Sequence, residues 1–95
     1  MSEITFGKLK INLDLKEVFI EENSIKLTKL EYNILTFLLN NRNKIFSREE
    51  LIDKAWSESV SKRAVDTAIS RLRSKLASYG KHLITRLGFG YGFIE

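Results

Sequence analysis

Residues 61–79 carry a set of side chains that could bind nucleic acid if the segment forms one helix. At helical spacing five polar residues share one face, namely Arg63, Thr67, Ser70, Arg71 and Ser74. A guanidinium can donate a bidentate pair of hydrogen bonds to guanine, and a Ser or Thr hydroxyl can bond a base edge or a phosphate. The alternative is a basic face that only meets solvent. The helix alone favours neither interpretation, so its place in the chain must decide.

The opposite face of the same helix is apolar. It carries Val65, Ala68, Ile69, Leu72 and Leu76, a stripe that predicts burial against the rest of the domain. Lys62, Arg73 and Lys75 lie toward the sides, where we expect them to contact phosphates. Asp66 lies on the same flank as Arg73, two turns away, and we predict an internal ion pair that orients Arg73.

Positive charge is concentrated in the last third of the chain. Residues 1–60 hold nine Lys/Arg and ten Asp/Glu, a balance of −1, whereas residues 61–95 hold seven against two, a balance of +5, giving the net +4. This asymmetry indicates a polyanionic partner. Solubility alone, or an acidic protein partner, would also account for it.

Composition argues against several other classes. Ninety-five residues predict a single domain, residues 1–95. The chain has no Cys, no apolar run long enough for a membrane span and no signal-peptide pattern, so we expect a cytoplasmic protein without membrane association. The single histidine, His82, falls in a turn, where we expect it to be solvated. We expect no enzyme, no catalytic residue, no metal site and no cofactor.

The predicted elements change type along the chain. Residues 1–27 read as a four-stranded antiparallel meander, with strands expected at Ile4–Phe6, Leu9–Leu13, Val18–Ile20 and Ser24–Leu27. Residues 28–79 read as three helices. Two capping boxes open the first two helices, Thr28 with Glu31 and Ser47 with Glu50.

The helix boundaries follow from local signals. The first helix should end near residues 40–42, where Asn41 suits a C-terminal turn, and the second should run through Trp56. Trp56 could stack on a base, but a core or loop-anchoring role is favoured. Residues 57–60 would form a tight connection to the third helix, 61–79, which Gly80 should stop. Helix, short turn and a second helix with a basic face is a helix-turn-helix arrangement.

A β-hairpin is predicted at residues 83–94. Its strands would be Leu83–Leu87 and Tyr91–Ile94, joined by Gly88-Phe89-Gly90, whose glycines can supply positive φ. Phosphate-binding glycine loops need a helix after them, and here a strand follows. A hairpin directly after a helix-turn-helix is called a wing.

In this order the motifs resemble the C-terminal DNA-binding (effector) domain of OmpR/PhoB-type response regulators, an α+β winged helix-turn-helix. The matching segments are Leu27-Thr28 to Leu35, Ser47-Arg48-Glu49-Glu50-Leu51 with Trp56, Val65-Asp66 to Leu76, and Gly88-x-Gly90-Tyr91 with Phe93. Any one of these segments would be a weak signal, but together they cover nearly the whole chain at close to the family spacing.

The resemblance implies sequence-specific binding of double-stranded DNA for transcriptional regulation in a bacterial two-component phosphorelay. The helix 61–79 would lie in the major groove and the wing 83–94 near the minor groove. A second copy on tandem half-sites and RNA polymerase are further candidate partners. The candidate DNA-binding residues are Lys62, Arg63, Thr67, Ser70, Arg71, Arg73, Ser74, Lys75, Arg86 and Tyr91.

The sequence departs from the family pattern at two places. Leu87 stands where the family has a wing arginine, and Arg86 is one residue earlier, so the wing contact with DNA is open. The connection after Trp56 is about two residues short, so polymerase recruitment does not carry over from the resemblance. An interaction module with an acidic protein partner remains the alternative function. RNA binding is a weaker third, because the A-form groove is narrow.

Overall fold

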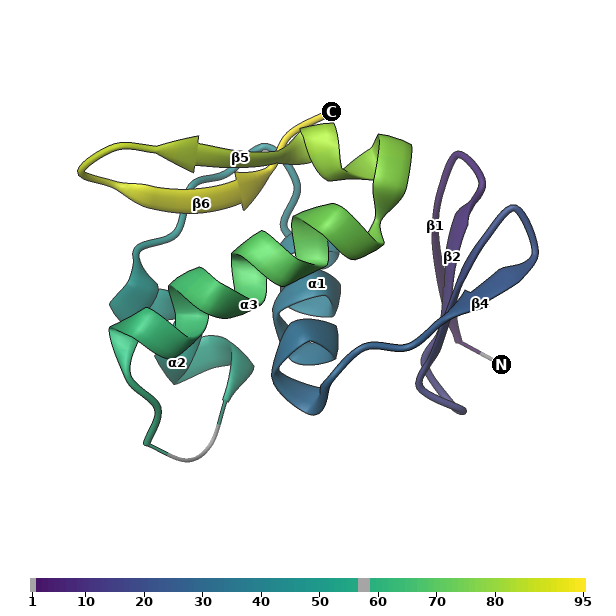
Figure 1. The fold of residues 1–95 in the computed structure, drawn as a ribbon, viewed down its shortest axis with the longest axis horizontal. Coiled ribbons are helices and arrows are strands. Elements are labelled where there is room, and N and C mark those ends of the chain that lie inside the picture. Colours follow the sequence, from purple (N-terminus) through teal and green to yellow (C-terminus); the bar gives the residue numbers. More distant parts are fainter. Residues whose placement is uncertain (1, 57–58) are drawn as a thin grey trace.

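A computed structural model describes residues 2–56 and 59–95, and its elements follow the predicted order (Figure 1). They are β1 (Glu3–Phe6), β2 (Leu9–Asn12), β3 (Glu17–Ile20), β4 (Asn23–Ile25), α1 (Lys29–Asn40), α2 (Arg48–Ala55), α3 (Lys62–Lys75), a 3-10 helix η1 (Ala77–His82), β5 (Leu83–Arg86) and β6 (Gly90–Phe93). The four-stranded sheet stands at one end of the molecule, the helices lie in the middle, and the β5–β6 hairpin runs along α3 toward the opposite end. The α+β winged helix-turn-helix fold is confirmed.

The N-terminal sheet is the predicted antiparallel meander, in the order β1-β2-β3-β4. Register places Ile4 opposite Ile11 and Ile11 opposite Val18. Because alternate side chains point to one face of a strand, these three residues form a buried row that faces the helices. The sheet therefore supplies one wall of the core.

Both capping boxes form as predicted. The Thr28 and Ser47 side chains accept from the amides of Glu31 and Glu50, and the two glutamates accept from the amides of Thr28 and Ser47 at 2.9 Å each. Helix α1 ends at Asn40, where the side chain of Asn41 donates to a backbone carbonyl.

Helix α2 ends one residue before the predicted end. Trp56 is its C-cap, in extended conformation (φ −145°), so it lies outside the helix. The indole is half-buried, and the ammonium of Lys29 lies 5.5 Å from the ring centroid. Residues 57 and 58 of the predicted connection lie outside the described residues.

The third helix is shorter than predicted. It ends at Lys75 rather than Tyr79, because the chain turns at Ala77, which adopts φ +52°, and continues as the 3-10 helix. Gly80 is therefore not the helix stop. It is buried, and a side chain there would collide with the carbonyl of Arg73. The early turn brings the hydroxyl of Tyr79 within 2.7 Å of the amide of Lys8, which joins η1 to the β1–β2 turn of the sheet.

His82 also differs from its prediction. Its ring is half-buried rather than solvated, with the Phe6 ring 4.8 Å away edge-on and the Phe93 ring stacked at 5.4 Å. Its Nδ1 lies 2.8 Å from the carbonyl oxygen of Ile94. The histidine thus fills the seam between the sheet and the hairpin.

The C-terminal hairpin is anchored along β6 to the segment that precedes α2. Tyr91 exchanges two backbone hydrogen bonds with Phe46, at 2.8 and 2.9 Å. Side chains at Gly90 or Gly92 would run into the carbonyls of Phe46 and Lys44, and Gly90 has φ +136°, so only glycine permits this approach. Strand β5 ends at Arg86, so Leu87 belongs to the turn, not to the strand as predicted.

One cluster of buried apolar side chains joins the sheet, the three helices and the hairpin. Leu9 and Ile11 come from β2, Leu35 from α1, Leu72 from α3 and Phe93 from β6, each with no more than 1% of its surface exposed. Because α3 packs into the middle of this cluster, its remaining face must look outward.

Candidate nucleic-acid interface

The polar face of α3 is open to solvent, as the sequence predicts. The five residues assigned to it are all exposed, namely Arg63, Thr67, Ser70, Arg71 and Ser74. The opposite stripe is buried, comprising Val65, Ala68, Ile69, Leu72 and Leu76. Ser61 caps the helix by accepting from the amide of Ala64 at 3.0 Å, which fixes where the face begins.

The arginines of this face border a shallow hollow between α3 and the start of α1. Arg63, Thr67 and Arg71 line it from α3, and Thr28 and Glu31 line it from α1. The two arginines thus share an indented part of the surface with the hydroxyl-bearing residues Thr28 and Thr67. Such a surface offers several hydrogen-bond donors to a ligand rich in acceptors.

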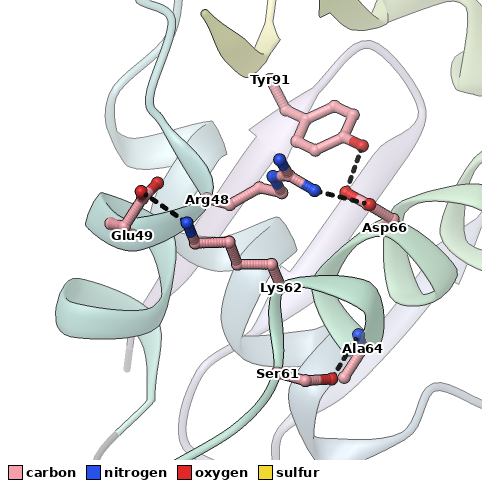
Figure 2. Close-up of polar contacts among 7 residues, drawn as sticks. All are labelled: Arg48, Glu49, Ser61, Lys62, Ala64, Asp66 and Tyr91. Atoms are coloured by element: carbon pink, nitrogen blue, oxygen red, sulfur yellow. Dashed lines mark hydrogen bonds and ion pairs between the residues drawn. The ribbon is translucent and has the colours of Figure 1, made fainter.

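Asp66 does not pair with Arg73, contrary to the prediction. Its carboxylate accepts from Arg48 at 3.0 Å and from the hydroxyl of Tyr91 at 2.6 Å (Figure 2). The three residues come from α2, α3 and β6, so one carboxylate ties together both helices of the helix-turn-helix and the wing. The prediction failed because it considered only partners on the same helix.

Tyr91 is held as a hydrogen-bond donor in this cluster. Burial, and then the hydrogen bond to Asp66, raise the pKa of the Tyr91 hydroxyl above its ordinary value. The phenol therefore keeps its proton at neutral pH and continues to donate to Asp66. Tyr91 was predicted to contact DNA, but its polar atom faces the protein's own carboxylate.

Arg73 is bound to the wing instead. Its Nε donates to the carbonyl of Leu83 and a terminal nitrogen donates to the hydroxyl of Thr85, both at 3.0 Å. The half-buried guanidinium thereby holds β5 against α3. Arg73 and Asp66 both fix the hairpin, at its two strands.

Lys75 reaches across to α1, where its ammonium lies 2.7 Å from the carboxylate of Glu31. Only 1% of the Glu31 side chain is exposed, against 34% for Lys75. Burial alone would raise the pKa of Glu31, but hydrogen bonds from Lys75 and from the Thr28 amide outweigh it, and the pKa is lowered. The sequence did not suggest this pair. The capping-box position of Glu31 explained its presence without a second role.

Lys62 forms an exposed ion pair with Glu49 of α2 at 3.0 Å (Figure 2). The hydrogen bond from Lys62 lowers the pKa of Glu49. Arg48 and Glu49, both at the start of α2, were not among the predicted site residues. Their place in a capping box gave a sufficient structural reason for them, and no sequence signal indicated their partners on α3.

At the wing, Arg86 and Leu87 are both exposed. Arg86 ends β5 opposite Gly90, and no ion pair joins it to any residue in the described ranges 2–56 and 59–95. Among the same residues, no group of His, Asp or Glu side chains is arranged to hold a metal ion. None of the helices described is long and apolar enough to cross a membrane.

Comparison with known proteins identifies relatives across nearly the whole chain. Residues 21–93 match the family described as "Transcriptional regulatory protein, C terminal". The chain is 39% identical over 93 residues to the uncharacterized transcriptional regulatory protein YrkP of Bacillus subtilis, a match that covers 92% of this chain and 40% of YrkP. The chain thus spans about two-fifths of the length of this curated relative.

Solved structures agree with the observed fold. The DNA-binding domain of response regulator AdeR, in complex with an intercistronic region, superposes with TM-score 0.85 at 31% identity, covering 96% of this chain and 98% of that one. Response regulator DrrB of Thermotoga maritima, an OmpR/PhoB homologue, gives TM-score 0.85 at 36% identity, covering 98% of this chain and 44% of that one. The fold, the family match and the identities together place the chain in the family of C-terminal domains of OmpR/PhoB-type transcriptional regulatory proteins.

Proposed function

We propose that residues 1–95 bind double-stranded DNA at a specific sequence and so regulate transcription. Helix α3 would lie in the major groove, and the wing would lie near the adjacent minor groove. The observation that carries this proposal is the exposed polar face of α3, whose apolar stripe is buried in the core. An α-helix fits the roughly 12 Å width of the major groove. The complex of AdeR, a relative with the same fold, supports the proposal.

Three groups of residues would contact DNA directly. Arg63 and Arg71 would reach base edges, since they are exposed and each can donate a bidentate pair to guanine. The hydroxyls of the same face, on Thr67, Ser70 and Ser74, would bond bases or phosphates. Lys62 and Arg86 would contact phosphates and steer the approach.

The other three candidates would act from behind the interface. Arg73 holds β5, Tyr91 holds Asp66, and Lys75 neutralises the buried Glu31. Each would support the DNA-facing surface by fixing the wing or α3 rather than by offering its polar atoms to the duplex. This division gives the ten candidate residues two separate kinds of role.

The whole protein would be a cytoplasmic response regulator, with these residues as its effector part. YrkP is about two and a half times as long as the matched segment, which leaves room for a phosphoacceptor receiver domain in a full-length relative. Binding of two copies to tandem half-sites would follow the resemblance, and contact with RNA polymerase would require the segment that follows Trp56. Both partners belong to the proposal.

Selection of bound sites from random duplexes tests the proposal. It should return one motif, with a repeat spacing if two copies bind. On that site Arg71→Ala should cost about 1–3 kcal/mol of binding free energy. The difference in affinity between the selected site and random DNA should become smaller. Lys26→Ala, which removes an exposed cation near β4 at the sheet end, is the matched control and should change neither affinity.

Two outcomes would contradict the proposal. If Arg71→Ala lost equal affinity for cognate and random DNA, Arg71 would be a phosphate contact rather than a base contact. If no duplex is enriched at low or high salt, the sequence-specific function fails. Capture of an acidic protein through the same face would then favour an interaction module.

A further inference from the structure

The tip of the wing is apolar and highly exposed. Leu87 has 91% of its surface exposed and Phe89 has 74%. The remaining exposed large apolar residue of the described chain, Leu15, lies in the β2–β3 turn of the sheet. Exposing two large apolar side chains with one glycine between them costs solvation free energy, which burial against a partner would recover.

The structure holds this tip away from the body of the domain. The turn is closed by a hydrogen bond from the amide of Phe89 to the carbonyl of Arg86, at 2.9 Å. Gly88 at its apex has φ +84°, and no atom lies within 4 Å of where a side chain would start. The strands of the hairpin are meanwhile fixed, β6 to Phe46 and β5 to α3. The two side chains are therefore presented at the end of a rigid support.

The surroundings of the tip indicate which partner it meets. Leu87 and Phe89 border a hollow with Arg86 and with Arg48 at the start of α2. The two carboxylates in that hollow are already neutralised, Asp66 by Arg48 and Glu49 by Lys62. Arg86 thus leaves a positive potential beside the tip, which suits a polyanion. Asp66 of α3 lines the same hollow, so the tip lies beside α3.

A second copy of this chain fits the tip less well. An aromatic side chain buries roughly 150–250 Å², so the two residues supply at most about 500 Å², whereas a stable protein interface takes about 800 Å² from each partner. The tip can therefore add to a larger interface but cannot form a stable one alone. The polar face of α3 offers such an interface.

We propose that Leu87 and Phe89 form an apolar wedge that packs against the walls of the DNA minor groove beside the major-groove site of α3. This inference rests on the proposed DNA-binding function. Apolar side chains can occupy the minor groove against sugars and base edges, and they release no counterions there. The wedge would make the wing contact largely independent of salt, unlike the contact of an arginine.

The test compares the wild-type domain with Leu87→Ala/Phe89→Ala, Arg86→Ala and the matched control Leu15→Ala, on the selected duplex at several salt concentrations. The double variant should lose about tenfold in affinity with an unchanged salt slope. Arg86→Ala should reduce the slope by about one. Leu15→Ala should have the affinity and the salt slope of wild type. Thermal unfolding should be unchanged in the double variant, since both side chains are exposed.

Three results would overturn the wedge while leaving the proposed function intact. The double variant could bind like wild type, it could lose salt slope as Arg86→Ala does, or it could abolish a self-association that wild type shows without DNA. If wild type binds no duplex, the proposed function itself fails. Leu87→Arg provides a further check. It should steepen the salt slope of DNA binding, whereas Leu15→Arg should leave that slope unchanged. An equal slope in the two arginine variants would place the tip away from DNA.

Discussion

Two pairs of cations on α3 differ in whether the protein's own groups hold them. Arg63 and Arg71 project from the exposed face with Thr67 between them, whereas Arg73 and Lys75, in the last turn, are held by Leu83 and Glu31. The four residues contribute equally to the sequence charge, but only the first pair presents charge to a ligand. Net charge alone therefore overstates the number of cations available to a ligand. The partners of each cation within the protein decide its role.

The same difference separates the cations that would recognise DNA from those that support the fold. The exposed pair can be replaced without loss of packing, whereas the held pair fixes α1 and the wing around the helix. A substitution in the first group should change DNA affinity and leave stability unchanged, and one in the second should do the reverse. The predictions below test that separation.

The largest effect on stability is expected from Lys75→Met, which removes the cation and leaves the Glu31 carboxylate buried. An uncompensated buried charge is costly, and because one third of Lys75 is exposed we expect a loss of about 2–3 kcal/mol in the free energy of unfolding. Urea unfolding measures it. The salt slope of DNA binding should not change. If the urea midpoint equals that of wild type, or if the salt slope of DNA binding is reduced, Lys75 contacts DNA rather than supporting the fold.

The pH dependence provides the control for this pair. The pKa of Glu31 is lowered from 4.5, so its stabilisation is complete above that pH and is lost as pH falls through the lower folded value. In Lys75→Met burial, the Thr28 amide and the charge of Arg71 remain, and we expect burial, the largest of the three, to raise the pKa of Glu31. The stability difference between the two proteins should therefore begin to shrink as pH falls through the raised pKa of the variant, above 4.5, and should go on shrinking as pH falls through the lowered pKa of the wild type. A difference that stays constant down to acid unfolding would exclude Glu31 as the cause.

A smaller effect is expected from Tyr91→Phe, which removes one donor to Asp66. The stability loss should be about 0.5–1.5 kcal/mol, the usual range for one hydrogen bond. Because the wing would then be less firmly oriented on α3, Arg86→Ala should cost less DNA affinity in this background than in wild type. A double-mutant cycle on the selected duplex measures the coupling.

Tyr79→Phe is the matched control for that cycle. It removes a hydroxyl that accepts from the Lys8 amide at 2.7 Å, at the junction between η1 and the sheet. It should lower stability but leave the effect of Arg86→Ala unchanged. Equal coupling in both tyrosine variants would mean that Asp66 has no special part in orienting the wing.

Local patterns were enough to predict most of the fold. The capping boxes, the strand alternation and the apolar stripe of α3 all depend on residues at most a few positions apart. The capping boxes, the stripe and the four strands formed, although β4 spans Asn23–Ile25 and so ends two residues before the predicted Leu27. The exposed face of α3 could be predicted for the same reason. Once the apolar stripe is buried, the opposite face must point outward.

Features that depend on tertiary contacts were missed. Asp66 pairs with Arg48, 18 residues away, rather than with Arg73 on its own helix. The end of α3 is set by the left-handed conformation of Ala77, a residue type that gives no such signal, and by the contact of Tyr79 with the β1–β2 turn. Which cations remain available to DNA therefore emerged only once the elements were packed together.

The smallest effect should come from Glu49→Gln, which sharpens the contrast between held and exposed cations. Lys62 is paired with Glu49 at 3.0 Å, with 53% of the Lys62 side chain and 65% of the Glu49 side chain exposed. Removing the negative charge releases the ammonium, so binding to cognate and random DNA should strengthen equally, by about twofold, because exposed pairs are weak. Salt titration should show a slightly steeper slope. Lys62→Ala should shift affinity and slope in the opposite direction, again equally on both sequences. A change confined to the cognate site would make Lys62 a base contact, and no change in either variant would place the start of α3 outside the DNA interface.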